Sequence, residues 1–274
     1  MLTDKLNYLV DKKLNANDPG GVFHAYQLSS VFKSAEKRGK QSGFIFYIPA
    51  WNTSKIDPVT GFVNLFDLKY ENIDKAKSFF SKFQIIRYNI ERDWFEFIFD
   101  YDSFNSKASG TKVGWTLTTH GDRILSFRNS EKNNQWDSRA VILTDEYKAL
   151  FDKYGIDYND NLKEAITNQT EKAFFEDLLK CLRLTLQMRN SVIGTDTDFL
   201  ISPVADNNGV FYDSRICADS LPKNADANGA YNIARKGLML IDQIKKASDV
   251  RNIKFDIANK SWLDFAQKKP YLDE

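Results

Sequence analysis

The sequence predicts a protein of mixed α/β and α+β class, and three patterns carry that prediction. An unbroken apolar and aromatic run at residues 43–51 predicts a strand buried on both faces of a sheet. Alternating apolar residues between 84 and 128 predict short antiparallel strands. Apolar residues at helical spacing in 170–189 predict an amphipathic helix. A buried sheet layer is therefore expected beside a block of small strands and helices.

The first 62 residues carry the elements expected for the buried layer. Residues 3–14 have helical spacing, and the turn residues of 15–21 end that helix. The strand at 43–51 is followed by a loop at 53–61. The opening helix has no convincing cap residue before it, so we expect the chain to start inside a helix of a longer protein.

The middle of the chain has a different pattern, with one predicted helix and several short predicted strands. Residues 71–82 are predicted to be helical. Phe95, Phe97 and Phe99 alternate with Glu96 and Ile98, which predicts an antiparallel strand with one buried face. The strands predicted in this region cover 84–90, 94–101, 113–119 and 123–128.

Helices return after residue 145. They are predicted at 145–153, 160–167 and 170–189. The last has an apolar stripe of Phe175, Leu178, Leu179, Leu182 and Leu186. Short strands are predicted at Phe199–Ile201 and Val210–Tyr212, a helix from Ala227 to Lys246, and a weaker helix at 260–268.

Composition excludes several classes of protein. With 274 residues and 42% hydrophobic content, the chain is long and apolar enough for one large or two small domains. The net charge of +1 gives no general signal for nucleic acid, so any such contact must come from local patches. Cys181 and Cys217 cannot form a CxxC pair, which leaves no zinc motif. Two cysteines without such a motif favour a reducing environment, so we expect a cytoplasmic protein. No apolar run approaches the roughly 20 residues that cross a bilayer, so we expect no membrane partner.

Asp226 is the candidate metal ligand. It precedes a predicted helix whose early small residues, Ala227, Gly229 and Ala230, would let the helix approach a sheet closely. A carboxylate there can hold Mg²⁺ together with waters and phosphate oxygens. Two such ions stabilise the attacking and leaving oxygens of a phosphodiester. The alternative is an ordinary N-cap, since a carboxylate is also favoured at that position.

Several motifs carry a family resemblance. The segment Asp226-x-Asn228-Gly229-Ala230-x-Asn232-Ile233 resembles the third motif of RuvC-like nucleases. Other segments resemble the type V-A CRISPR effectors, the Cpf-type nucleases. They are Gly43–Ala50, Thr53–Phe62, Leu186–Ser191, Ile201–Val204 and Phe211–Arg215. These motifs follow the family's order over essentially the whole chain.

The resemblance implies an architecture and a reaction. A partial RNase-H-like (RuvC) layer would comprise residues 1–62, after the second motif, and 224–274, with an α+β Nuc domain inserted at 63–223. The prokaryotic parent protein would hydrolyse target DNA with Mg²⁺, at a site selected by guide RNA, in antiviral defence. Asp226 matches the last of three catalytic acids. The other two would lie upstream, so the two-metal site is expected only in the full-length protein and this chain alone is expected to be inactive.

Arg189 matches the functional arginine of the family's Nuc domain, and it is expected at the end of the helix 170–189. A guanidinium can hold a phosphate through two hydrogen bonds. Gln187 and Asp198 match polar positions beside it and are expected to position the substrate, Asp198 by orienting the arginine. The alternative is an arginine bound to the last carbonyls of its helix.

Other functions remain open. The first is a non-catalytic DNA-binding or docking module that retains the fold, and the second is an unrelated α/β scaffold. His24 and His120 have no nucleophile paired with them, which argues against a Ser–His or Cys–His hydrolase. The strand 43–51 would lack neighbours in this chain, so we also expect self-association through its exposed edge.

Overall fold

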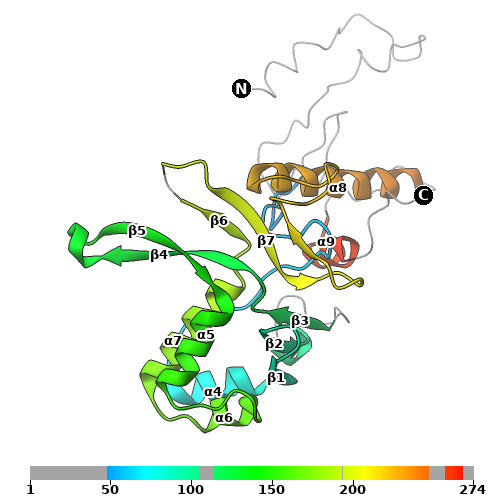
Figure 1. Ribbon diagram of the computed structural model, residues 1–274. Helices are drawn as coiled ribbons and strands as arrows, with labels where there is room; N and C mark the ends of the chain where they lie inside the picture. Colours follow the sequence, from blue (N-terminus) through cyan, green and yellow to red (C-terminus); the bar gives the residue numbers. More distant parts are fainter. Residues whose placement is uncertain (1–47, 105–113, 193, 247–256, 268–274) are drawn as a thin grey trace, which may run out of the picture. The chain divides into compact units, whose positions relative to one another are not determined.

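The computed structural model describes residues 48–104, 114–192, 194–246 and 257–267 (Figure 1). The chain forms two compact units, each built from two stretches of sequence. Unit 1 comprises residues 1–51 and 232–262, and unit 2 comprises residues 52–231 and 263–274.

The described residues form six helices and eight strands. The helices are α4 (Ile73–Ser81), α5 (Leu143–Lys153), α6 (Leu162–Asn168), α7 (Lys172–Thr185), α8 (Ala225–Lys246) and α9 (Asn259–Ala266). The strands are β1 (Ile85–Asn89), β2 (Trp94–Phe99), β3 (Trp115–Thr118), β4 (Asp122–Asn129), β5 (Gln135–Ile142), β6 (Arg189–Ser191), β7 (Asp198–Ala205) and β8 (Phe211–Asp213). Three small antiparallel sheets result, with the orders β1-β2-β3, β4-β5 and β6-β7-β8. This mixture agrees with the predicted α+β class, while the RNase-H-like layer stays a prediction.

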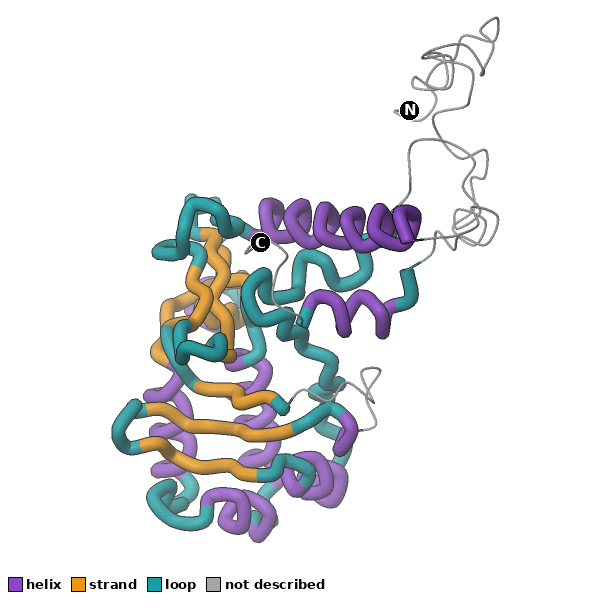
Figure 2. Tube along the Cα trace, turned by 90° about the vertical axis from the view of Figure 1, so that its right-hand side faces the viewer, coloured by secondary structure: helices purple, strands orange, loops and turns teal. Residues whose placement is uncertain are grey.

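The core of unit 2 lies between the β1–β3 sheet and the helices α4 to α7, which Figures 1 and 2 show gathered together. Phe95, Phe97 and Phe99 are fully buried, which confirms the predicted alternation in β2. Glu96 departs from it, because its side chain is also buried. Its carboxylate accepts hydrogen bonds from Arg87, Asn89 and Trp94, which offset the cost of burial.

The stripe on α7 is buried as predicted, but the helix ends earlier. Thr185 is its last residue and Leu186 its C-cap, so Arg189 does not end a helix; it begins β6. Sheet pairing takes over at this point, because the Ile201 N–H donates to the Met188 carbonyl at 3.0 Å. The buried Asn190 side chain also holds β6 in place by accepting from the Ile124 N–H at 2.9 Å.

A tight turn in unit 2 joins two distant parts of the chain. The Asp57 carboxylate accepts from the backbone N–H groups of Val59 at 2.7 Å and Thr60 at 3.1 Å. Gly61 follows with φ +74°, a conformation that favours glycine. A Cβ at Gly61 would lie 2.4 Å from the Ala266 carbonyl oxygen, so only glycine allows this close approach to the end of α9.

In unit 1, the described part of the predicted strand 43–51 is not a strand. Residues 48–50 are loop and Trp51 begins a turn, while 43–47 and the predicted helix 3–14 lie outside the described residues. Proline has no N–H for a sheet ladder. The Pro49 carbonyl instead accepts from Lys236 Nζ at 2.8 Å.

Of the helices that the structure describes, none is long and apolar enough to cross a membrane.

Candidate functional site

Arg189 and Asp198 form an ion pair on one face of the β6–β7 ladder. Arg189 pairs with Leu200 and Ser191 with Asp198, so the two charged side chains are diagonal neighbours. Arg189 Nε and Nη2 donate to the two carboxylate oxygens at 2.9 and 3.2 Å. The side chains are 54% and 32% exposed, so solvent and an incoming phosphate can both reach the pair.

The electrostatic surroundings of Arg189 include the candidate metal ligand. The hydrogen bond to Asp198 raises the pKa of Arg189, burial partly opposes this rise, and the negative charges of Asp198 and Asp226 add smaller increases. The pair with Asp198 uses two of the five N–H groups of an arginine. Arg189 is therefore a charged donor held by one carboxylate and influenced by a second.

Asp226 lies in the first turn of α8 and its side chain is exposed. The alternative that Asp226 caps this helix is wrong, because Asn224 takes that role. Asn224 Oδ1 accepts from the Ala227 N–H at 2.9 Å, and its carbonyl accepts from the Asn228 N–H at 2.9 Å. The carboxylate of Asp226 is thus left near the positive end of the helix dipole without serving as the cap.

The small residues after Asp226 serve a different contact from the one expected. Ala230 is exposed, and a Cβ on Gly229 would lie 3.7 Å from the Ser54 side chain, an ordinary contact. The buried Asn228 amide donates to the carbonyls of Ser54 at 3.2 Å and Ile56 at 3.0 Å. The start of α8 therefore packs on the turn around residues 52–57, where a sheet was expected.

Gln187 is directed into the fold. Its Nε2 donates to the Ile124 carbonyl at 3.0 Å and to Asn190 Oδ1 at 3.1 Å. These bonds tie the segment before β6 to β4 and so support the position of Arg189. A direct role of Gln187 toward a substrate stays a prediction.

The described residues supply one candidate ligand for a metal ion at this site. Nowhere in the described parts of the chain do three or more His, Cys, Asp or Glu side chains gather in a group that could hold a metal. The exposed Asp226 carboxylate suits Mg²⁺, which needs few protein ligands when phosphate and water complete its shell. Further acids would have to come from elsewhere to fix a metal pair.

Arg215, the last residue of the motif Phe211–Arg215, links two strands through ion pairs. Its Nη2 donates to Asp122 at 2.8 Å and to Asp213 at 2.6 Å, and its guanidinium lies 4.1 Å from the Phe199 ring centroid. The bonds to both carboxylates hold its pKa above the ordinary value. This network ties β4 to β8, and the sequence motif alone did not reveal its partner Asp122.

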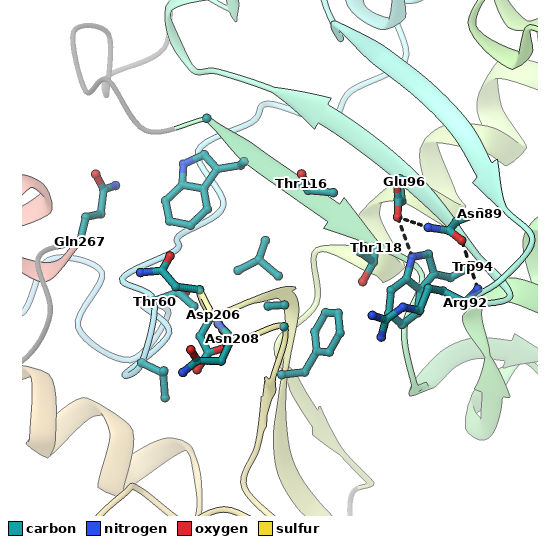
Figure 3. Close-up of a pocket in the computed structure, with 18 residues that line it drawn as sticks. Thr60, Asn89, Arg92, Trp94, Glu96, Thr116, Thr118, Asp206, Asn208 and Gln267 are labelled. Carbon is teal, nitrogen blue, oxygen red and sulfur yellow. Dashed lines mark hydrogen bonds between the residues drawn. The ribbon is translucent and has the colours of Figure 1, made fainter.

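A cavity of about 700 Å³ in unit 2 was not predicted (Figure 3). Its wall combines residues from β2, β3, the β7–β8 turn and the loop before α4, together with Gln267. Trp94 and Arg92 stand at one end of it and Gln267 at the other. These segments are far apart in the sequence, so no local spacing could indicate the cavity.

Most of the residues of this site lie in a segment that matches a known protein family. The NUC family, described as a nuclease domain, matches residues 56–216, which is more than half of the chain. The chain belongs to this nuclease domain family, which is of the Cas12a type. Gln187, Arg189 and Asp198 fall inside the matched region, and Asp226 lies beyond it.

Proposed function

We propose that the chain is the C-terminal nuclease portion of an RNA-guided DNA endonuclease. The Nuc domain would position the target strand, and Asp226 would be one ligand of a Mg²⁺ site completed in the full-length protein. Alone, the chain would not cleave DNA, because it offers one of the three acids.

One observation supports this proposal most. The nuclease domain family matches residues 56–216, which include Arg189 on β6. Asp226, on α8, adds a small electrostatic effect on Arg189, although 37 positions of sequence separate them. A phosphate held by the guanidinium would therefore lie within electrostatic range of the carboxylate that would hold the metal. The family match supports a nuclease role for the domain that carries Arg189.

The residues suggest how the work is divided. Asp198 holds the guanidinium through Nε and Nη2, which keeps the fork in one orientation. The remaining N–H groups would donate to a phosphate oxygen of the strand. Bound Mg²⁺ would neutralise charge on the phosphodiester and activate water. The exposed carboxylate of Asp226 would serve as one protein ligand of that ion.

The test is DNA cleavage by the full-length protein with guide RNA and Mg²⁺. We expect Asp226→Ala to abolish cutting while DNA binding persists, and Arg189→Ala to impair cutting, most strongly on one strand. Asp219→Ala is a matched control for the carboxylate, because Asp219 is fully exposed and pairs only with Lys223 among the described side chains. Arg139→Ala is the control for the arginine, since Arg139 is an exposed residue paired with Glu146.

The same experiment separates the alternatives. Salt-dependent DNA binding with normal cutting by Asp226→Ala would favour a non-catalytic binding module. Loss of function in the controls as well would indicate general destabilisation. Cutting by the isolated chain that needs Asp226 would contradict the expectation that the site is completed elsewhere.

A further inference from the structure

Aromatic rings and neutral polar groups share the wall of the 700 Å³ cavity. Trp94, Trp115 and Phe211 supply the rings, while side chains such as Asn89 and Asn208 supply amides. The volume falls in the range of roughly 300 to 1,000 Å³ that is typical of small-ligand sites. Rings with convergent amides suit a planar ligand that has hydrogen-bonding edges.

The rings at one end already form a cluster. Phe211 stacks on His120 with centroids 4.1 Å apart and an interplanar angle of 18°. Trp94 meets Phe211 edge-on at 5.4 Å. Trp94 and Phe211 are both partly exposed where they line the cavity. Because the Trp94 and Phe211 rings are nearly perpendicular, a flat ligand could stack on the face of one and meet the other at its edge. Stacking on aromatic side chains is how bases of single-stranded nucleic acid bind to proteins.

The charged side chains of the cavity wall indicate whether the ligand carries a phosphate. The carboxylate of Glu96 is engaged by Arg87, Asn89 and Trp94, and Asp206 Oδ1 accepts from the N–H groups of Asn208 and Val210. Among the lining residues, Arg92 is the exposed cation, 5.7 Å from the Trp94 ring centroid. One cation suits one phosphate, which argues for a single nucleotide unit over a polyphosphate.

Two hydrogen-bond donors in the wall have unmet bonds. Within the part of the chain that the structure describes, Trp115 Nε1 and Gln267 Nε2 are buried and lack a partner. A buried donor without a partner is costly. Both atoms have almost no exposed surface, so a ligand would not reach them. Nucleobases carry ring nitrogens and carbonyl oxygens that accept hydrogen bonds, and these would meet exposed amides of the wall such as that of Asn208.

We propose that this cavity is a second nucleic-acid site, which takes one unpaired base of a single-stranded DNA. The base stacks on Trp94 and meets Phe211 at its edge, its polar groups face the amides, and its phosphate lies at Arg92. The inference rests on the proposed function in taking a DNA strand as the ligand. The cavity residues are separate from Arg189 and Asp226, so the two sites can be tested apart.

The test uses the intact chain and a short single-stranded DNA that carries one fluorescent adenine analogue, whose emission falls when it stacks on an aromatic ring. We expect quenching with the native chain. Trp94→Ala should abolish the quenching and lower affinity about tenfold. Arg92→Ala should lower affinity severalfold and keep the quenching, whereas Arg139→Ala should change neither.

A second pair of variants guards against misfolding by Trp94→Ala. Thr116 is exposed on β3 and lines the cavity, so Thr116→Phe fills the space at a strand position that tolerates aromatic residues. It should abolish quenching, while Thr116→Ser should behave as native. Trp94→Phe keeps a ring and should restore part of the quenching.

The inference is overturned if the native chain gives no quenching, or if Trp94→Ala and Thr116→Phe quench as the native chain does. If cleavage by the full-length protein proves indifferent to Arg189 and Asp226 while quenching depends on Trp94, the proposed function fails and the cavity site stands. If cleavage depends on Arg189 and Asp226 while quenching does not depend on Trp94, the cavity site alone is contradicted.

Discussion

Arg189 lies diagonally across the β6–β7 ladder from Asp198, and two hydrogen bonds of 2.9 and 3.2 Å join the guanidinium to the carboxylate. The pair is half exposed, so its worth for stability is small, roughly 0–1 kcal/mol. The pair instead orients the planar guanidinium of Arg189 toward an acceptor outside the chain, such as a phosphate oxygen. Stability and activity should therefore respond differently when the pair is changed.

Replacing Arg189 by lysine should separate these two effects. Lysine keeps the charge but lacks the paired N–H donors of a guanidinium. We therefore expect the free energy of unfolding, measured in urea, to change by less than about 1 kcal/mol, while cleavage by the full-length protein falls clearly. Asp198→Asn should give a milder loss of cleavage, because the arginine loses its orientation and not its charge. Equal cleavage by Arg189→Lys and native protein would contradict the positioning role.

Substitutions at Asn224 and Asp226 should lower the free energy of unfolding by different amounts. Asn224→Ala removes the cap of α8 and should cost about 1 kcal/mol. Asp226→Asn removes only a favourable charge near the helix start, which is worth a few tenths to about 1 kcal/mol. Urea unfolding of the two variants at low ionic strength measures both. A larger loss for Asp226→Asn would mean that the carboxylate has a structural role.

Two glycines with positive φ form a matched pair. Gly61→Ala should destabilise by more than about 2 kcal/mol, because strain from φ +74° is joined by a clash with the Ala266 backbone. Gly155, with φ +63°, has open space where a Cβ would lie, with nothing within 4 Å, so Gly155→Ala should cost only about 1–2 kcal/mol. Thermal or urea unfolding gives the comparison. Similar losses would show that the contact with Ala266 relaxes easily.

His120 predicts a dependence of stability on pH. Burial lowers the pKa of His120 below 6.5 and the charge of Arg123 lowers it further, while Asp213 and Asp122 partly oppose them. As pH falls below about 6.5, the unfolded chain takes up this proton first, so stability is lost until the folded pKa is passed. His120→Phe keeps a ring beside Phe211 and should flatten this part of the profile. An unchanged acid slope in that variant would exclude His120 as its source.

The sequence predicted the periodic elements well. Helix α4 and strands β1 to β4 appeared where helical spacing and alternation placed them. Strand β2 shows the reason most clearly, because Phe95, Phe97 and Phe99 are all buried. Strand β5 was missed, since seven of its eight residues are polar or exposed and its order comes from pairing with β4. The end of α7 was misplaced, because the contacts of Asn190 with β4 are tertiary and leave no local signal.

The candidate site was only partly predictable. Asp198 beside Arg189 could be named from the motif resemblance, but their diagonal register could not. Asn224 as the cap of α8 was overlooked, although a cap residue at that position is a local signal. The cavity depends on five separated segments meeting in space, which only the fold can bring together.

The close approach of Gly61 to Ala266 has a practical consequence for moving this nuclease domain into other proteins. The family match ends at residue 216, yet the compact unit also includes residues 263–274. A graft limited to the matched residues would leave the backbone around Gly61 uncovered and remove Gln267 from the cavity wall. The transferable part is therefore discontinuous, and a designed graft should carry the end of α9 as a second piece.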